Sequence, residues 1–215
     1  METESRLSAV VAGVVVLVAG ALWLRVTLPD AAAQSGTASA AEPRLYLPLV
    51  QLRHTFLQRL ELICNGGFES GSVGWEEESS EGLYLVNNAV ARTGEWSAWL
   101  GGRNNAVDVL HQTVSVPAEA VAARLQFYLY VASDELVSEP RDFLSVQLRN
   151  TAGNPLESFL QIDNTSAGSG WCLVAHEWDV FTPYAGTELQ LAFRALTDAV
   201  HVSDFIIDDV SFLVS

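Results

Sequence analysis

The residues best placed to do chemistry are two adjacent carboxylates, Asp208 and Asp209, near the end of the sequence. They lie within the apolar run "FIIDDVSF" of residues 205–212. Two charges inside so apolar a strand lower stability unless a partner compensates them. The sequence contains no lysine, and the nearest arginine along the chain, Arg194, belongs to the preceding predicted strand. Calcium, which takes about six to eight oxygen ligands, is the simplest partner for such a pair.

A glycine-rich stretch earlier in the sequence offers further oxygen ligands. "NGGFESGSVGW", residues 65–75, combines four glycines with one carboxylate, Glu69. Glycine adopts backbone conformations that other residues avoid, so a turn such as 65–67 lets carbonyl oxygens approach a shared centre. This stretch is therefore a second candidate part of the metal site.

Catalytic motifs are not found in the sequence. There is no H-E-x-x-H pair, G-x-S-x-G elbow, Walker loop or C-x-x-C. Acidic residues are plentiful enough for paired carboxylates of the glycosidase kind, but "EEESSE" at 76–81 is most simply a solvated loop. We therefore predict that the protein is not an enzyme. The widely spaced histidines are His54, His111, His176 and His201.

Short runs of alternating apolar residues follow residue 62 and predict the elements that position these side chains. Within "LQFYLYV", for example, Leu125, Phe127 and Leu129 share one face, and Tyr128 and Tyr130 share the other. Period-two alternation without helical crossovers predicts an all-β, two-sheet antiparallel sandwich. Strands are expected near 60–64, 83–87, 96–100, 107–116, 122–131, 142–149, 156–162, 173–180 and 188–214, the last being two strands with a turn around 197–200.

The N-terminal segment predicts export. Residues 7–24 are uncharged and apolar, which fits either a signal-peptide core or a membrane-spanning helix, and Ala31 to Ala33 offer a small-residue cleavage site. The expected organisation is a signal peptide or single anchor at 1–33, a linker and extended lead-in at 34–58, and a β-sandwich domain at 59–215. The location is then extracellular or cell-surface, with the membrane as a partner if 7–24 is retained.

Two cysteines, Cys64 and Cys172, allow a single intramolecular disulfide. An exported protein favours such a bond, and two buried free thiols are the alternative.

The net charge of −15 limits the classes of molecule that the protein can bind. So acidic a surface repels phosphate backbones, which argues against nucleic acid. It is compatible with cations, with neutral ligands and with solubility alone.

Three motifs together resemble the galactose-binding-like jelly rolls, a superfamily that includes carbohydrate-binding modules and accessory domains of secreted bacterial proteins. They are "NGGFE…GW", "ARTGEWSAWLGG" and "WDVFTPYAGTELQLAFRALTD…FIIDDVSF", and the resemblance covers residues 60–215. It implies a jelly-roll fold and a structural calcium ion bound by Glu69 and Asp208, with a backbone carbonyl from 93–96. Asp209 is a further candidate, although strand alternation should point it away from Asp208.

The resemblance also implies a polysaccharide or glycan partner, which aromatic side chains would contact by stacking on sugar rings. The alternative for each aromatic residue is packing under loops. The alternative for the protein is a membrane-tethered accessory or structural subunit of a cell-envelope assembly, with other envelope proteins as partners and no small ligand. The candidate aromatic residues are Tyr84, Trp96, Trp99, Tyr128, Tyr130 and Trp178.

Overall fold

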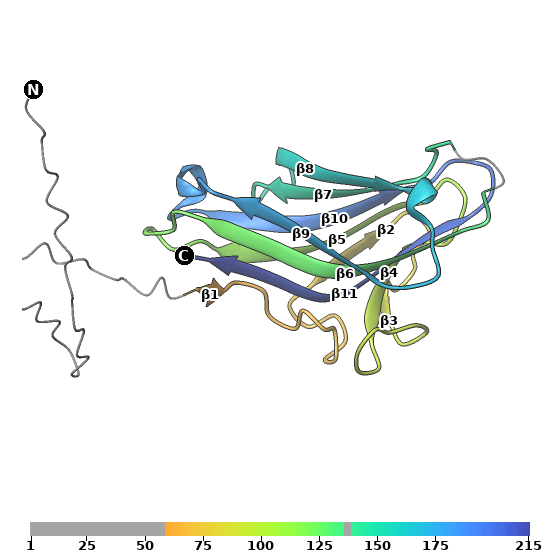
Figure 1. Ribbon diagram of the computed structural model, residues 1–215, viewed down its shortest axis with the longest axis horizontal. Helices are drawn as coiled ribbons and strands as arrows, with labels where there is room; N and C mark the ends of the chain where they lie inside the picture. The colour runs from red at the N-terminus through yellow and green to blue at the C-terminus, as the bar shows by residue number, and fades with distance from the viewer. Residues whose placement is uncertain (1–58, 136–138) are drawn as a thin grey trace, which may run out of the picture. The chain divides into compact units, whose positions relative to one another are not determined.

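The computed structural model describes residues 59–135 and 139–215, which form eleven β-strands and two short 3-10 helices (Figure 1). The predicted apolar segment 7–24, the cleavage site at 31–33 and the linker 34–58 lie outside the described residues. In the described part of the chain, no helix has the length and apolar character needed to cross a membrane. The elements are β1 (Leu60–Glu61), β2 (Glu76–Ser79), β3 (Val86–Asn87), β4 (Ser97–Gly101), β5 (Val107–Ser115), β6 (Ala123–Ser133), β7 (Phe143–Arg149), β8 (Pro155–Asp163), η1 (Asn164–Ser166), β9 (Cys172–Trp178), η2 (Thr182–Tyr184), β10 (Glu188–Leu196) and β11 (Ser203–Val214).

The described strands form two antiparallel sheets, as the alternation predicts. One has the order β3-β4-β11-β6-β9, with β1 also paired to β11, and the other has the order β2-β5-β10-β7-β8. Figure 1 shows β9, β6 and β11 side by side in the first sheet and β8, β7 and β10 in the second. From β4 onward the chain passes to the other sheet at each connection except the β7–β8 hairpin. Such crossovers are typical of jelly rolls.

The core lies between the two sheets. In β6 buried and half-buried residues alternate from Ala123 to Val131, so one face of the strand is directed inward. Phe127 of β6 meets Phe193 of β10 edge-on, with ring centroids 5.1 Å apart, and both are fully buried. Burying a phenylalanine side chain contributes about 1.5–3 kcal/mol, so such pairs hold the sheets together.

The stretch at 65–75 connects the beginning of the domain to its last strand. Leu60 pairs with Val214, and the Glu61 carboxylate accepts a hydrogen bond from the Phe212 N–H at 2.7 Å. The Val210 N–H donates to the Gly66 carbonyl at 2.9 Å, and a side chain at Gly66 would collide with the Val210 carbonyl. Glycine is therefore required at this close approach.

The prediction that 76–81 is only a solvated loop is wrong for residues 76–79. They form β2, an edge strand paired with β5 in register from Glu76↔His111 to Ser79↔Asp108. Glu76 and Glu78 are exposed, whereas the Glu77 carboxylate accepts the Leu85 N–H and Val86 N–H. Charged residues suit an edge strand because they oppose pairing with another chain.

Both cysteines are free and exposed, so the predicted disulfide and the alternative of buried thiols are both wrong for this structure. Cys172 begins β9, paired with Leu129 of β6, whereas Cys64 follows β1 and its N–H donates to the Gln112 side chain. β6 and β11 lie between β9 and β1 in this sheet, so the strand that carries Cys172 and the strand that precedes Cys64 are not neighbours.

Candidate ligand-binding site

A β-bulge in β11 brings Asp208 and Asp209 into contact with the same loop, residues 92–96, which precedes β4. The pairing register of β11 with β6 shifts between Asp208 and Ser211, and Asp209 has a φ of 52°. The Asp208 carboxylate accepts hydrogen bonds from the Arg92 N–H at 2.8 Å and the Thr93 N–H at 3.1 Å. Asp209 pairs with the Arg92 guanidinium and accepts from the Thr93 hydroxyl. The prediction that alternation points the two carboxylates away from each other is therefore wrong.

Glu69 binds the other end of that loop. Its carboxylate accepts the Glu95 N–H and the Trp96 N–H, each at 3.0 Å. Gly94, with a φ of 64°, lies between the two sets of contacts, and a Cβ there would collide with the Glu69 carboxyl group. Glu69 and Asp208 therefore both accept hydrogen bonds from the backbone of residues 92–96. This loop includes 93–96, the segment that the family resemblance implies as a source of a carbonyl ligand.

Amide groups and an arginine compensate the charges that the sequence left without a partner. Burial raises the pKa of Asp208, while hydrogen bonds from the Thr93, Arg92 and Asp209 N–H groups lower it. Arg92 escaped notice because it lies more than a hundred residues before Asp209 in sequence. The loop presents N–H donors to Glu69 and Asp208, so the geometry does not itself display a calcium site, and the ion at these two residues stays a prediction.

Two of the predicted aromatic residues, Tyr84 and Trp99, line one hollow of about 440 Å³. Tyr84 is 88% exposed and Trp99 is half-buried on β4. Polar side chains of Asn87, Asn88 and Arg103 line the same hollow. The residues come from the β2–β3 connection, from β3 and the loop after it, and from β4 with the loop that follows it.

A hydrogen bond holds the Trp99 ring in place. Its Nε1–H donates to Asp204 Oδ1 on β11 at 2.8 Å. Burial raises the pKa of Asp204, and this hydrogen bond opposes the rise. Gly102, with a φ of 69°, leaves no side chain between the backbone and the indole. The ring is therefore fixed at the wall of the hollow.

An aromatic strip, defined here as Trp99, Tyr130 and Trp171, continues from the hollow across the outer face of the sheet. Trp99 and Tyr130 both pair with Ile206, from opposite sides of β11. The centroid of the Tyr130 ring lies 5.9 Å from that of the Trp171 ring. Trp171 directly precedes β9, the strand that pairs with β6. Sequence reasoning missed Trp171 because it lies in a glycine- and serine-rich turn, where no periodicity assigns it a face.

The other three predicted aromatic residues have partners elsewhere. Tyr128 lies beneath the Arg92 guanidinium, and half-buried Trp96 packs against the core. Trp178 is buried with its ring 5.5 Å from Phe181. The contacts of these three rings are packing contacts, which was the alternative for each of them.

Solved structures with a similar fold include carbohydrate-binding modules. A carbohydrate-binding module of family 61, solved with β-1,4-galactotriose, superposes with a TM-score of 0.53 and 18% identity, covering 73% of this chain and 99% of that one. The described domain shares the fold of this module. This confirms, at the level of fold, the resemblance to galactose-binding-like jelly rolls.

Two further solved structures have a similar fold. The enzymatically active domain of tailspike protein 4 from bacteriophage CBA120 has a TM-score of 0.50 and 15% identity, over 72% of this chain and 21% of that one. A family 16 carbohydrate-binding module has a TM-score of 0.48 and 19% identity, over 70% and 98%. Protein-family models and curated protein sequences give no match.

The sheet of β2, β5, β10, β7 and β8 carries a polar patch, defined here as His111, Gln147, Arg149, Gln190 and Arg194. Arg149 is buried, and burial lowers its pKa, as does the neighbouring Arg194, while Glu78 raises it. His111 Nδ1 and Gln190 Oε1 are buried without hydrogen-bond partners in the described structure. Sequence reasoning missed the patch, because each residue occupies an ordinary outward position in its strand.

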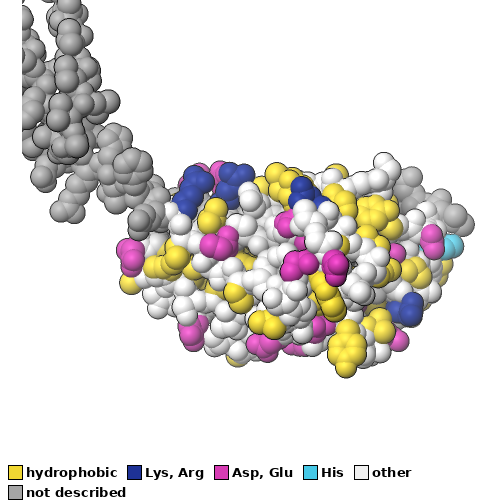
Figure 2. All heavy atoms as spheres, turned by 90° about the horizontal axis from the view of Figure 1, so that it is seen from below, with side chains coloured by type: hydrophobic (Ala, Val, Ile, Leu, Met, Phe, Trp, Pro, Cys, Tyr) yellow, Lys and Arg dark blue, Asp and Glu magenta, His cyan; other side chains and the backbone are white. Residues whose placement is uncertain are grey.

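Acidic side chains are spread over the face seen in Figure 2, with hydrophobic ones between them and few basic ones. This agrees with the net charge of −15. A neutral ligand meets no electrostatic barrier at such a surface.

Proposed function

We propose that this protein binds carbohydrate without catalysis, at the hollow lined by Tyr84 and Trp99. The observation that carries the proposal is the convergence of two accessible aromatic rings with Asn87, Asn88 and Arg103 on one hollow. Rings of this kind stack on the apolar faces of sugars, and a few polar groups in a mostly apolar pocket fix a ligand's orientation. Amide groups can donate hydrogen bonds to sugar hydroxyls and accept them, and a guanidinium group donates to hydroxyl oxygens.

The aromatic strip favours a polysaccharide or oligosaccharide chain over a single sugar. Trp99 and Tyr130 lie on strands two apart, which corresponds to about 9–10 Å at the usual strand spacing. A chain of sugar rings can reach both rings at once. The complex of the family 61 module with galactotriose supports this class of ligand.

Catalysis is not part of the proposal. The polar groups of the hollow named above are amides and a guanidinium, which do not exchange protons near neutral pH. Asp204 beside them holds the Trp99 indole through a hydrogen bond.

Export and calcium also belong to the proposal. The apolar segment 7–24 supports an exported protein, membrane-anchored if that segment is retained. The family resemblance supports a structural calcium ion at Glu69 and Asp208. The mass of the native protein measures whether residues 1–33 are removed.

Affinity electrophoresis of the full chain in gels containing soluble polysaccharides tests carbohydrate binding, after a glycan array has selected the ligands. We expect Trp99→Ala and Tyr84→Ala each to weaken binding by more than about tenfold, because centrally placed aromatic rings dominate such interfaces. Arg124→Ala, on the outer face of the same sheet, is the control.

Two results would overturn this site. If Arg149→Ala abolishes binding while Trp99→Ala leaves it intact, the ligand binds at the polar patch. If no glycan binds and the protein co-purifies stoichiometrically with envelope proteins, the accessory-subunit alternative replaces carbohydrate binding.

A further inference from the structure

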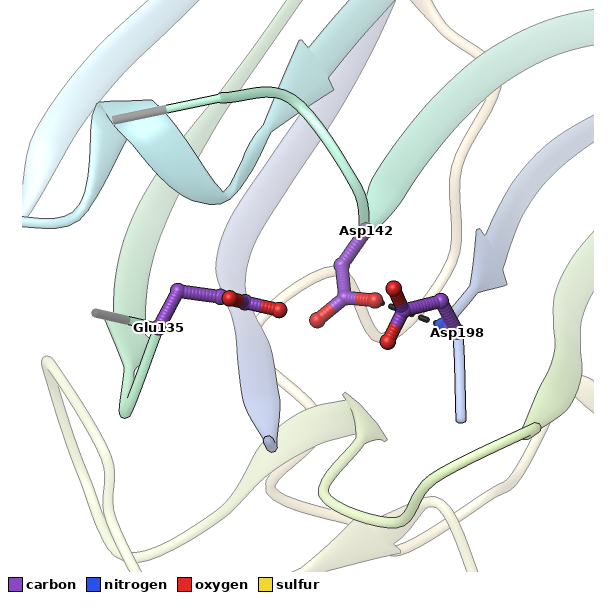
Figure 3. Close-up of side chains that lie close together, drawn as sticks. All are labelled: Glu135, Asp142 and Asp198. Atoms are coloured by element: carbon purple, nitrogen blue, oxygen red, sulfur yellow. Dashed lines mark hydrogen bonds between the residues drawn. The ribbon is translucent and has the colours of Figure 1, made fainter. Parts of the chain in front are cut away.

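Three carboxylates that are far apart in the sequence converge at one end of the sandwich. Glu135 follows β6, Asp142 precedes β7 and Asp198 follows β10. One oxygen from each lies within 4.8 Å of the others, and Figure 3 shows the three side chains directed toward a common centre. None of the three took part in the metal prediction from the sequence.

Asp142 is the unusual member, because it is fully buried and only partly hydrogen-bonded. Its Oδ1 accepts the Asp198 N–H at 2.7 Å, the dashed line in Figure 3, whereas its Oδ2 has no partner. Glu135 Oε1 is also buried without a partner. A buried carboxylate oxygen without a hydrogen bond lowers stability, so these two atoms point to a missing partner.

The backbone around Asp142 is held rigidly. Asn164, itself buried, accepts the Arg141 N–H at 2.8 Å and the Asp142 N–H at 3.2 Å through its side-chain oxygen. Its amide group donates to the Glu139 carbonyl at 3.0 Å. The Asp142 carboxylate is thus positioned before any ligand arrives, which favours tight binding.

The neighbouring arginine does not neutralise the cluster. Arg141 approaches Asp198 at 3.6 Å and is also 3.4 Å from Glu139, with its side chain 39% exposed. The unpartnered oxygens belong to Asp142 and Glu135, so the net charge at the centre stays negative.

We propose that Glu135, Asp142 and Asp198 bind a calcium ion, at a site separate from Glu69 and Asp208. Three oxygens within 4.8 Å of one another suit a hard cation with calcium–oxygen distances of about 2.3–2.6 Å. Glu135 and Asp198 are half-buried, so water can fill the other coordination positions. Magnesium is less suitable, since it requires shorter distances in a stricter octahedron.

The ion would also fix a wall of the ligand hollow. The Asp198 carbonyl accepts the Asn105 N–H at 2.6 Å, and the Thr197 hydroxyl donates to the Arg103 carbonyl at 2.6 Å. The loop that carries Arg103 is therefore bound to the loop that carries Asp198.

Calorimetric titration of the metal-free full chain with calcium chloride tests the site, together with melting temperatures measured with and without calcium. We expect Asp142→Asn and Glu135→Gln each to weaken calcium binding by more than about tenfold. Glu139→Gln, an exposed carboxylate beside Arg141, and Glu69→Gln, at the other predicted site, should retain this binding event. Magnesium chloride should compete poorly.

The melting temperature separates a metal ligand from a structural carboxylate. If Asp142 is a ligand, Asp142→Asn should melt at or above wild type without calcium, because charge repulsion is removed. It should also lose the part of the calcium-dependent rise that Glu69→Gln retains. Three outcomes would overturn the proposal: no calcium binding by wild type, equal losses in Asp142→Asn and Glu139→Gln, or binding abolished only by Glu69→Gln.

Discussion

The Arg92 guanidinium lies 3.3 Å from the centroid of the Tyr128 ring. The same guanidinium pairs with Asp209, so a single side chain stacks on β6 and neutralises a carboxylate of the β11 bulge. This contact removes Tyr128 from the set of accessible ligand-binding rings. It also gives Asp209 the counter-charge that the sequence around it lacks.

Replacing Arg92 should therefore destabilise the bulge. We expect Arg92→Ala to lower the free energy of unfolding by about 1–3 kcal/mol, since it removes a cation–π contact and an ion pair together. Arg92→Lys should cost less, because it keeps the charge without the planar guanidinium. Chemical denaturation measures both, with Arg124→Ala, whose partner Glu177 is exposed, as the control. Equal effects at Arg92 and Arg124 would contradict the role assigned to the stack.

A side chain at Gly94 should detach the loop from Glu69. Gly94→Ala combines a positive φ with a collision against the Glu69 carboxyl group. Gly153→Ala is a matched control, because its φ is 80° with nothing within 4 Å of the added Cβ. The φ cost alone is about 1–2 kcal/mol, so we expect Gly94→Ala to lose clearly more unfolding free energy than Gly153→Ala. Equal losses would mean that the loop moves freely away from Glu69.

Alkaline pH should weaken the fold through Tyr184. Burial, followed by its hydrogen bond to Glu157 and the Glu157 charge, raises the pKa of Tyr184 to about 12 from its usual value of 10.0. The unfolded chain then loses this proton first, so stability falls as pH rises from about 10 toward about 12. Denaturation at several pH values should show a steeper fall for wild type than for Tyr184→Phe, with Tyr84→Phe as control. Parallel curves for wild type and Tyr184→Phe would refute this linkage.

Calcium removal tests the ion predicted at Glu69 and Asp208. Chelation should lower the melting temperature of wild type, and Glu69→Gln should reduce that response, because a structural ion stabilises only the folded state. Asp142→Asn leaves Glu69 unchanged and reports on the other site alone. If a chelator lowers the melting temperature equally in wild type and Glu69→Gln, the prediction of an ion at Glu69 and Asp208 is wrong.

The strands and the core could be predicted from the sequence because alternation is a local signal. The inward positions of β6 and β10, such as Phe127 and Phe193, follow directly from period two. β2 could not be recognised, because four polar residues become a strand only when β5 offers them an edge. The bulge at Asp209 broke the alternation on which its orientation was predicted.

The candidate sites were predicted less completely, because they depend on contacts between distant segments. Tyr84 and Trp99 were found as aromatic candidates, but their shared hollow also needs Arg103 from a loop without a pattern. Glu135, Asp142 and Asp198 carry no motif, and only the ends of β6, β7 and β10 bring them together. The ion pair between Arg92 and Asp209 could not be predicted either, because only the arginine nearest to Asp209 in sequence was considered as its partner.

The longest strand, β11, is also the last to be synthesised, yet it separates β4 and β1 from β6 in the sheet. The five other strands of this sheet precede β11 in the chain, and before residues 203–214 are synthesised only the β3–β4 and β6–β9 pairs can form among them. Until β11 is available, the backbone edges of β4 and β6 that pair with it have no partner strand. Pairing between strands so far apart in sequence slows folding, because a long loop must close before the new contacts stabilise it.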